Sequence, residues 1–448
     1  MAKFYIYIIW KNKITTISRD NTLTVKKELD KKSIGYWDFT SSKSTGIHKV
    51  CSYPATMVPD MQKELIEIVI EEDKTVKNIL DPFHGSGVTL VEGASLGLNP
   101  IGFDINPLAN LMSLVKLQGI NKNIISSSNR KIKNIICTPN YDFPVHNFNR
   151  INKWFRSDII NSLSLIRHAI QKEKYKNIRQ YYWVCLIDII KKYSNTRTST
   201  FKLHVKAEED INSLKNNVIN NFLESIETNY MYIPNYSRNK KINLAIGDTK
   251  KLLMGLGQES IDLICTSPPY GDNGTTVTYG QFSMLPLYWI DKKDLGNFDE
   301  NLLENYSSID SASLGGIKGN EKLVNYNSSL INEYVNSITK TKQKKVKRFV
   351  FDYLEVLEKL ATVLKKDKYM ILTLGNRRVD NKILPLTEIT KQFLETNHIN
   401  VVAELQRNIP KKRMPRKVSS VNNNSVSSMN VEYILILKKE KYYGFDSF

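Results

Sequence analysis

The chain has 448 residues, 41% of them hydrophobic, so it is long enough to bury a substantial core and to form two or three subdomains. Lysine and arginine number 64 against 45 acidic residues, and the net charge of +19 predicts a polyanionic partner, although a composition rich in Lys, Asn and Ile accounts for part of it. The four cysteines have no C-x-x-C spacing and the six histidines are scattered, so the pattern indicates neither a zinc site nor a disulfide framework and predicts a reduced, cytoplasmic protein.

The N-terminal segment begins with the apolar run Phe4–Trp10, which is too short to span a bilayer, lacks a small-residue cleavage site and predicts a strand. The run Tyr53–Pro59 then predicts a loop before a helix over Met61–Ile70. Neither segment identifies a function by itself.

A glycine turn follows the first strand expected in the core. The run Ile79–Ala94 predicts a strand end, a turn and a helix with its apolar residues on one side. Gly85 and Gly87 let the backbone approach a ligand closely, and the helix N-terminus behind them supplies unpaired N–H groups. A glycine pair alone more often marks an ordinary tight turn, so the inference depends on the residues around it.

Two carboxylates close the next two strands expected along the chain. Asp104 ends the strand Pro100–Phe103, at the distance from the glycine turn that is usual for a residue holding a ribose diol. A helix N-cap is the alternative role for it. Asp248 ends the strand Ile242–Gly247 and would be unremarkable without the two motifs before it, because carboxylates often cap helices.

A long insertion, residues 119–241, separates these two strands. Trp154–Gln171, Asn177–Lys192 and Glu208–Thr228 have helix-like apolar spacing. Between the last two helices lies a polar, basic stretch that holds Arg197 and Lys202, which are candidate contacts to the polyanionic partner. A purely structural helical layer is an equally good interpretation of the insertion.

The most informative stretch is Thr266–Tyr270, which follows the apolar strand Ile261–Cys265. Pro268 and Pro269 fix their own φ, restrict the residues before them and have no N–H. The loop therefore offers two rigid acceptors, the Ser267 hydroxyl and the Pro268 carbonyl, beside the ring of Tyr270. Two acceptors and a ring suit a flat substrate that carries an amino group, as a nucleobase does.

The C-terminal third completes the alternation of helices and strands. A helix is expected over Phe349–Leu364, after the basic run Lys340–Arg348, and strands over Tyr369–Leu374, Val401–Gln406 and Glu432–Leu437, while no fixed structure is assigned to residues 295–345. The connection between the last two strands is basic, which predicts contact with phosphates. Its candidate phosphate-contacting residues are Lys411, Lys412, Arg413, Arg416 and Lys417.

The Ser267–Tyr270 tetrapeptide resembles the catalytic motif of the DNA amino-methyltransferases, which methylate exocyclic nitrogens of bases with S-adenosylmethionine, and Asp81–Gly87 resembles their cofactor loop. Val88 stands where the family more often has Thr, a departure that should be tolerated. The resemblance implies that Asp81 faces the methionine part of the cofactor and Asp248 the adenine amino group. The cofactor contacts it implies are Tyr53, Pro54, Asp81, Pro82, Phe83, Gly85, Ser86, Gly87, Thr89, Asp104, Ile105 and Asp248.

The resemblance also implies a reaction at Ser267, Pro268, Pro269 and Tyr270: direct methyl transfer to a flipped-out base, with no covalent intermediate. No Pro-Cys nucleophile occurs, and Cys265 is expected in the core. Because family members with Ser in the first position mostly methylate cytosine N4, that activity is expected here. An adenine-N6 enzyme is the alternative; an RNA amino-methyltransferase and a non-catalytic DNA-binding subunit are more remote.

Together these features predict an α/β fold: a Rossmann-like doubly wound methyltransferase sheet with a helical insertion. The expected divisions are 1–118 for the N-terminal segment and cofactor half, 119–241 for the helical insertion, and 242–448 for the catalytic half with basic DNA-contacting loops. The insertion is a candidate for DNA target recognition through Arg197 and Lys202. The expected partners are double-stranded DNA and a cognate restriction endonuclease in a prokaryotic cytoplasm, with no membrane and no metal.

Overall fold

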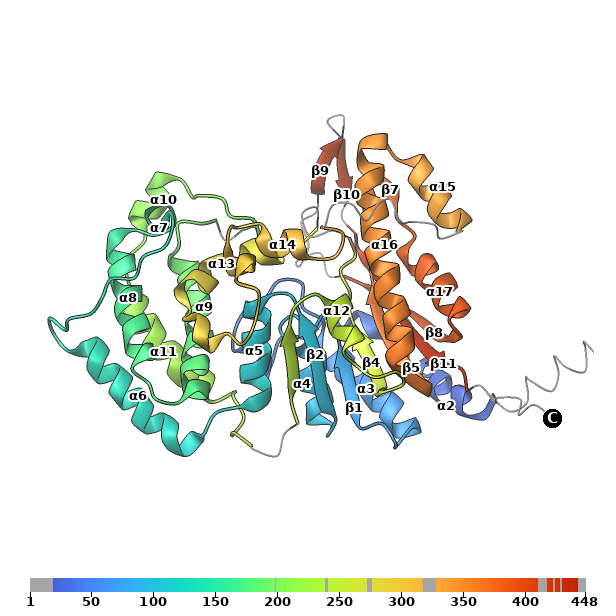
Figure 1. Cartoon of the computed structure of the whole chain (residues 1–448), viewed down its shortest axis with the longest axis horizontal. Coiled ribbons are helices and arrows are strands. Elements are labelled where there is room, and N and C mark those ends of the chain that lie inside the picture. Colours follow the sequence, from blue (N-terminus) through green and yellow to red (C-terminus); the bar gives the residue numbers. More distant parts are fainter. Residues whose placement is uncertain are drawn as a thin grey trace, which may run out of the picture.

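A computed structural model describes residues 19–197, 199–237, 241–271, 276–316, 328–409, 417–421, 424–427 and 429–441. Its centre is a seven-stranded sheet with the order β3-β2-β1-β4-β5-β11-β8 (Figure 1). The strands are β1 (Asn78–Asp81), β2 (Asn99–Asp104), β3 (Asn243–Ile246), β4 (Ile261–Thr266), β5 (Leu364–Leu374), β8 (Ile399–Asn408) and β11 (Val431–Lys439). The strand expected at Phe4–Trp10 lies outside the described residues.

The first five strands of this order run parallel and β11 runs antiparallel between β5 and β8. The order changes direction between β1 and β4, which is where a doubly wound sheet binds its ligand. Because β11 is antiparallel, it begins at the edge where the parallel strands end. The structure thus confirms the doubly wound sheet and the closing strand pair predicted from the sequence.

Helices cover both faces of the sheet because neighbouring residues of each strand point to opposite sides. Ile79, Leu263 and Ile371 pack with the N-terminal helices, whereas Ile264 and Leu372 belong to the core on the other face. One layer contains α2 (Arg19–Asp30), α3 (Pro59–Glu72) and α4 (Val88–Ser95); the other contains α12 (Thr249–Met254), α15 (Ser329–Ser337), α16 (Lys340–Val363) and α17 (Leu386–Thr396).

The insertion forms a helical body with its own core, to the left of the sheet in Figure 1. Its helices are α6 (Lys122–Cys137), α7 (Ile151–Trp154), α8 (Ser157–Gln171), α9 (Lys176–Tyr193), α10 (Glu208–Ser213) and α11 (Val218–Tyr230). They pack with α5 (Pro107–Gln118) and α13 (Tyr279–Trp289), while α14 (Ser308–Ala312) lies between the insertion and the sheet.

One of the three helices expected in the insertion is broken in two, because Glu208–Thr228 forms as α10 and α11. The helix expected from Trp154 begins at Ser157 as α8, after the extended Phe155 that separates it from α7. At the break between α10 and α11 the Arg156 guanidinium donates to the carbonyls of Ile211 at 2.6 Å and Leu214 at 2.8 Å. A tertiary contact thus satisfies groups that a continuous helix would have satisfied locally.

Residues 295–345 hold more structure than the sequence predicted. Their described part contains η5 (Glu300–Leu303), α14 and α15, and α16 begins at Lys340 rather than at Phe349. The N-cap Thr339 is held by Asp380, which accepts from its N–H at 2.8 Å and its hydroxyl at 2.7 Å. The basic run Lys340–Arg348 is therefore the first part of a long helix.

The remaining short elements are η1 (Tyr36–Asp38), η2 (Gly46–Lys49), η4 (Lys292–Asp294) and the strand pairs β6 (Arg378–Val379) with β7 (Lys382–Ile383) and β9 (Lys417–Val421) with β10 (Asn424–Ser427). Within the part of the chain described here, no helix combines the length and apolar character needed to cross a membrane.

Candidate active site

The residues singled out in the sequence lie along one edge of the sheet. Asp81 and Asp104 are the last residues of β1 and β2, Asp248 follows β3, and Ser267 follows β4. These four strands are parallel neighbours, so their carboxyl ends meet at that edge. The structure therefore brings the glycine turn, the carboxylates and the Pro-Pro loop together, as the sequence predicted.

Asp81 is fully buried, with 0% of its surface exposed. Its Oδ1 accepts from the Thr266 hydroxyl at 2.6 Å and from the Phe83 N–H at 3.1 Å. Its Oδ2 has no hydrogen-bond partner among the described residues. Burial raises the pKa of this carboxyl to about 7, against the opposing effect of the Thr266 and Phe83 hydrogen bonds. A buried acceptor without a protein partner can accept a hydrogen bond from a donor outside the chain.

The glycine turn and Asp104 hold each other. The Gly85 N–H donates to Asp104 Oδ2 at 2.9 Å, and the Asn106 N–H donates to Oδ1 at 2.8 Å. Each carboxylate oxygen keeps a further lone pair for a ligand hydroxyl. Gly87 has a φ of 79°, and a Cβ there would lie 2.6 Å from the Ser113 hydroxyl, so the turn requires glycine at this position.

Several residues that support the turn were not found from the sequence. Lys116 is buried beneath it and donates to the Ser86 carbonyl at 2.9 Å, and burial lowers its pKa to about 8. Asn106 donates to the Tyr53 hydroxyl at 3.1 Å and to Ser283 of α13 at 2.7 Å. A lysine inside the otherwise apolar face of α5 was the available signal for Lys116. Asn106, which caps α5, gave no sign of its tertiary contacts.

Tyr53 contacts another aromatic ring, whereas Asp248 caps a helix. Tyr53 stacks on Tyr279, with ring centroids 5.7 Å apart, and so links the N-terminal loop to α13. Asp248 caps α12, accepting from the Lys250 N–H at 2.9 Å, which is the commoner role for such a carboxylate. Its place after β3, next to β2, puts it on the same edge as Asp104.

The Pro-Pro loop is supported by residues far away in the chain. The Tyr270 hydroxyl lies 3.0 Å from the Ser267 hydroxyl and donates to Glu432 of β11 at 3.1 Å. Burial raises the pKa of Tyr270. A Cβ at Gly375, just after β5, would lie 2.5 Å from the Tyr270 ring, so the ring occupies the space that this glycine leaves. Glu432 and Gly375 carry no local signal in the sequence.

Cys265 is buried in β4 and donates to Gln62 at 3.1 Å, which confirms its expected place in the core. It lies within the strand and does not reach the loop edge.

The basic stretch of the insertion packs against α13, the helix that follows the Pro-Pro loop. The Leu203 N–H donates to Gln281 at 3.2 Å, and the Phe201 ring lies 6.2 Å from that of Phe282. Arg197 and Lys202 are exposed on this stretch. The fold therefore brings two cations of the insertion to the side of the candidate active site.

The second group of candidate DNA contacts is not placed by the structure. Lys411, Lys412, Arg413 and Arg416 lie outside the described residues, and Lys417 is described only as the first residue of β9.

Comparison with known proteins gives a family to this arrangement. A family model described as DNA methylase (N6_N4_Mtase) matches residues 2–110. The type II methyltransferase M.MvaI of Kocuria varians is 31% identical over 424 residues, covering 87% of this chain and 90% of that protein. The chain belongs to the type II DNA methyltransferases.

Other relatives match more loosely. The type II methyltransferase M.MjaII of Methanocaldococcus jannaschii is 33% identical over 103 residues, covering 21% of this chain and 18% of that protein. A putative DNA modification methylase of Thermus thermophilus, solved in complex with S-adenosyl-L-methionine, is 12% identical, with 45% of this chain and 54% of that chain covered and a TM-score of 0.23.

As a member of this family, the methyltransferase uses S-adenosyl-L-methionine as its methyl donor. Its residues fit that cofactor, because Asp81 holds a buried acceptor without a partner and Asp104 keeps acceptor capacity beside the glycine turn. Among the described residues, no three His, Cys, Asp or Glu side chains gather as a metal site would require.

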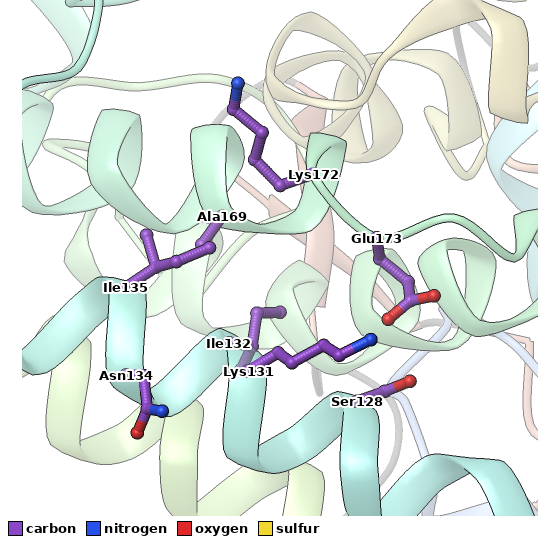
Figure 2. A pocket seen from close by; sticks show the side chains of 8 residues that line it. All are labelled: Ser128, Lys131, Ile132, Asn134, Ile135, Ala169, Lys172 and Glu173. Carbon is purple, nitrogen blue, oxygen red and sulfur yellow. The ribbon is translucent and has the colours of Figure 1, made fainter.

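A shallow groove of about 280 Å³ lies elsewhere on this methyltransferase, on the insertion (Figure 2). It is lined by α6 and the end of α8, with Ile132 and Ala169 on its walls and Lys131, Lys172 and Glu173 at its rim. None of the site residues takes part in it, so the groove is separate from the cofactor site.

Proposed function

We propose that this methyltransferase transfers a methyl group from S-adenosylmethionine to the exocyclic N4 of a cytosine flipped out of double-stranded DNA. One observation carries the proposal. The Thr266 hydroxyl donates to Asp81, and the next residue, Ser267, begins the acceptor loop. The candidate cofactor carboxylate and the candidate base-binding loop are therefore one hydrogen bond and one residue apart, as a direct transfer requires.

In this proposal the cofactor is held by the edge of β1, β2 and β3. Asp81 Oδ2 accepts from the ammonium group, Asp104 from the ribose hydroxyls and Asp248 from the adenine amino group. Tyr53 and Pro54 cover the carboxylate end, and the glycine turn gives the backbone room beside the ligand. The remaining contacts are Pro82, Phe83, Ser86, Thr89 and Ile105, which border these groups in the chain. Bound there, the cofactor supplies an electrophilic methyl group.

The loop residues act on the target base. Ser267 and the Pro268 carbonyl accept the two amino hydrogens, which draws the nitrogen lone pair out of conjugation with the ring. Flipping the base costs a few kcal/mol, and stacking on Tyr270 recovers roughly 1–3 kcal/mol of it. Pro268 and Pro269 keep the acceptors in place before the base arrives, so little reorganisation is needed during the reaction.

Cytosine N4 is favoured over adenine N6 because Ser267 stands where the cytosine-N4 members of the family have Ser. A serine hydroxyl accepts a hydrogen bond but is no strong base, which suits an amine that attacks through its own lone pair. Adenine N6 is the second candidate, since both bases present the same amino group to the loop.

The DNA would lie across the edge between the insertion and the C-terminal helices. We assign phosphate contacts to Arg197 and Lys202 of the insertion and, from the sequence, to the basic connection Lys411–Lys417. In a type II system, a restriction endonuclease with the same target sequence is the functional counterpart that we propose.

The test is mass spectrometry of nucleosides from DNA incubated with the protein and methyl-labelled S-adenosylmethionine, with RNA as a parallel substrate. Label in N4-methylcytosine is the expected result. Label in N6-methyladenine would overturn the base assignment, and label in RNA alone would overturn the substrate.

A further inference from the structure

A continuous line of hydrogen bonds runs from the Pro-Pro loop to β8, the edge strand of the sheet. It joins the side chains of Ser267, Tyr270, Glu432 and Arg407. The Ser267 and Tyr270 hydroxyls are 3.0 Å apart, and Tyr270 donates to Glu432 Oε1 at 3.1 Å. Arg407 of β8 donates to Glu432 Oε2 at 2.9 Å. Glu432 and Arg407 face each other in the register of β8 and β11, and their side chains are 16% and 5% exposed. The line therefore ends in an ion pair that is largely removed from water.

The chemistry of the four groups fixes the direction of each hydrogen bond. An ionised carboxylate can only accept, so the single hydroxyl hydrogen of Tyr270 is donated to Glu432. The Tyr270 oxygen can then only accept from Ser267, and the Ser267 hydroxyl becomes the donor of that pair. With its hydrogen committed, Ser267 presents only lone pairs to a target.

We infer that Glu432 is a positioning residue which sets the hydrogen-bond direction of the loop, so that Ser267 meets the target base only as an acceptor. The inference deepens the proposed function and rests on it. A loop of this polarity accepts from an amino group and repels a carbonyl oxygen, because two lone pairs would then face each other. Glu432 thus selects bases that carry an exocyclic amine without touching them.

Arg407 completes the arrangement from the other side. Both oxygens of Glu432 are engaged, one by Tyr270 and the other by the guanidinium of Arg407, so the carboxylate has one orientation. A fixed carboxylate holds the Tyr270 hydroxyl, and with it the ring, which packs over Gly375. The same ion pair therefore orients both the acceptor and the stacking surface of the loop.

The decisive variant is Glu432→Gln, which keeps the size of the side chain but adds an amide that can donate. The hydroxyl hydrogen of Tyr270 can then point toward Ser267, so Ser267 is no longer forced to donate to Tyr270 and no longer presents only lone pairs to the base. We expect kcat for DNA methylation to fall roughly 10- to 100-fold, as for the loss of a hydrogen bond to a charged group, while cofactor affinity and KM for DNA stay within about twofold.

Glu404→Gln is the matched control, because Glu404 lies on β8 and binds Lys391 at 2.9 Å on the outside of the sheet. It should keep wild-type kinetics. Tyr270→Phe is the second variant: it leaves the ion pair intact but removes the middle of the line, and adding Glu432→Gln to it should cause no further loss of kcat.

Three outcomes would overturn the inference. They are wild-type kcat in Glu432→Gln or in Tyr270→Phe, equal loss of cofactor affinity and kcat in Glu432→Gln, and multiplicative losses in the double variant. The identity of the methylated base reports on the proposed function, whereas the ratio of variant to wild-type rates reports on Glu432 whichever base is methylated.

Discussion

The glycine turn and the Pro-Pro loop lie at the same edge of the sheet, but they are held in different ways. The turn is held mainly from nearby in the chain, since Gly85 and Asp104 are 19 residues apart and Ser86 and Lys116 are 30 apart, with one distant contact from Asn106 to Ser283. The loop depends on Glu432, which is 162 residues from Tyr270. The turn and the loop, to which we assign cofactor binding and base capture, therefore have largely separate supports, joined by the hydrogen bond from Thr266 to Asp81. Substitutions should be able to damage one and spare the other.

The largest effect is expected on the cofactor side, from Asp81→Asn. The amide keeps an acceptor for Thr266 and Phe83 but puts an N–H group where the carboxylate oxygen without a partner lies. Affinity for S-adenosylmethionine should fall roughly 100-fold, the loss of a charge-assisted hydrogen bond in a buried site. Isothermal titration calorimetry measures it, with the exposed Asp60→Asn as control. Unchanged affinity would remove Asp81 from the cofactor site.

The next effect is expected on the catalytic side, from Gly375→Val. Its Cβ would meet the Tyr270 ring at 2.5 Å and would also collide with the Met429 sulfur, so the ring must move from its place. We expect methyl transfer to fall roughly 10- to 100-fold, because the displaced ring no longer stacks on the target base, with cofactor affinity retained. If cofactor binding fell equally, the two supports would not be separate.

The stability of the folded protein should depend on pH through Asp81, which belongs to the glycine-turn side of the site and not to the Pro-Pro loop. The pKa of this carboxyl is raised by burial from 3.8 to about 7 in the folded protein. Between these values the folded state holds a proton that the unfolded state has released, so stability should fall as pH rises through this window, by up to about 1.4 kcal/mol per pH unit. Urea unfolding without cofactor at pH 5, 6 and 7 measures it.

Asp81→Asn should lack this component of the pH dependence. The cofactor ammonium favours the ionised carboxylate, so binding should release a proton and strengthen in the wild type as pH rises from 6 to 7. A wild-type slope equal to that of Asp81→Asn would show that the carboxyl does not titrate there.

The smallest effect is expected from Arg197→Ala with Lys202→Ala, which touches neither support. If both side chains contact phosphates, the slope of log affinity for DNA against log salt should become shallower by about 2, with methyl transfer at saturating DNA unchanged. Lys131→Ala, in the groove on the insertion, is the control and should leave the slope as it is. An unchanged slope in the double variant would make this stretch a structural layer only.

The difference between contacts that are close in the chain and contacts that are distant also decides what could be predicted from the sequence. The cofactor half was predictable because its strand, turn and carboxylates follow one another within a short stretch, and their spacing carries the information. Ser267 and Tyr270 were found by their motif, but Glu432, Arg407 and Gly375 were not, because an ordinary strand residue becomes part of a site only through the pairing of distant strands.

The broken helix of the insertion, which forms as α10 and α11, follows the same rule. The carbonyls at its break are bound by Arg156, which lies 55 residues from Ile211. Apolar spacing on either side of the break continues without interruption, so periodicity alone predicts one helix where the fold has two.

The position of β11 has a consequence for the synthesis of the protein. This strand lies near the end of the chain but in the interior of the sheet, and β8 joins the sheet only through it. A ribosome-bound chain can therefore complete β1, β2 and the glycine turn long before residues 431–439 emerge. Until then β5 and β8 present unpaired edges and Tyr270 has no carboxylate to hold it. In the proposed assignment, the residues that bind the cofactor are thus all synthesised by Asp248, whereas the carboxylate that holds Tyr270 is made near the end of translation.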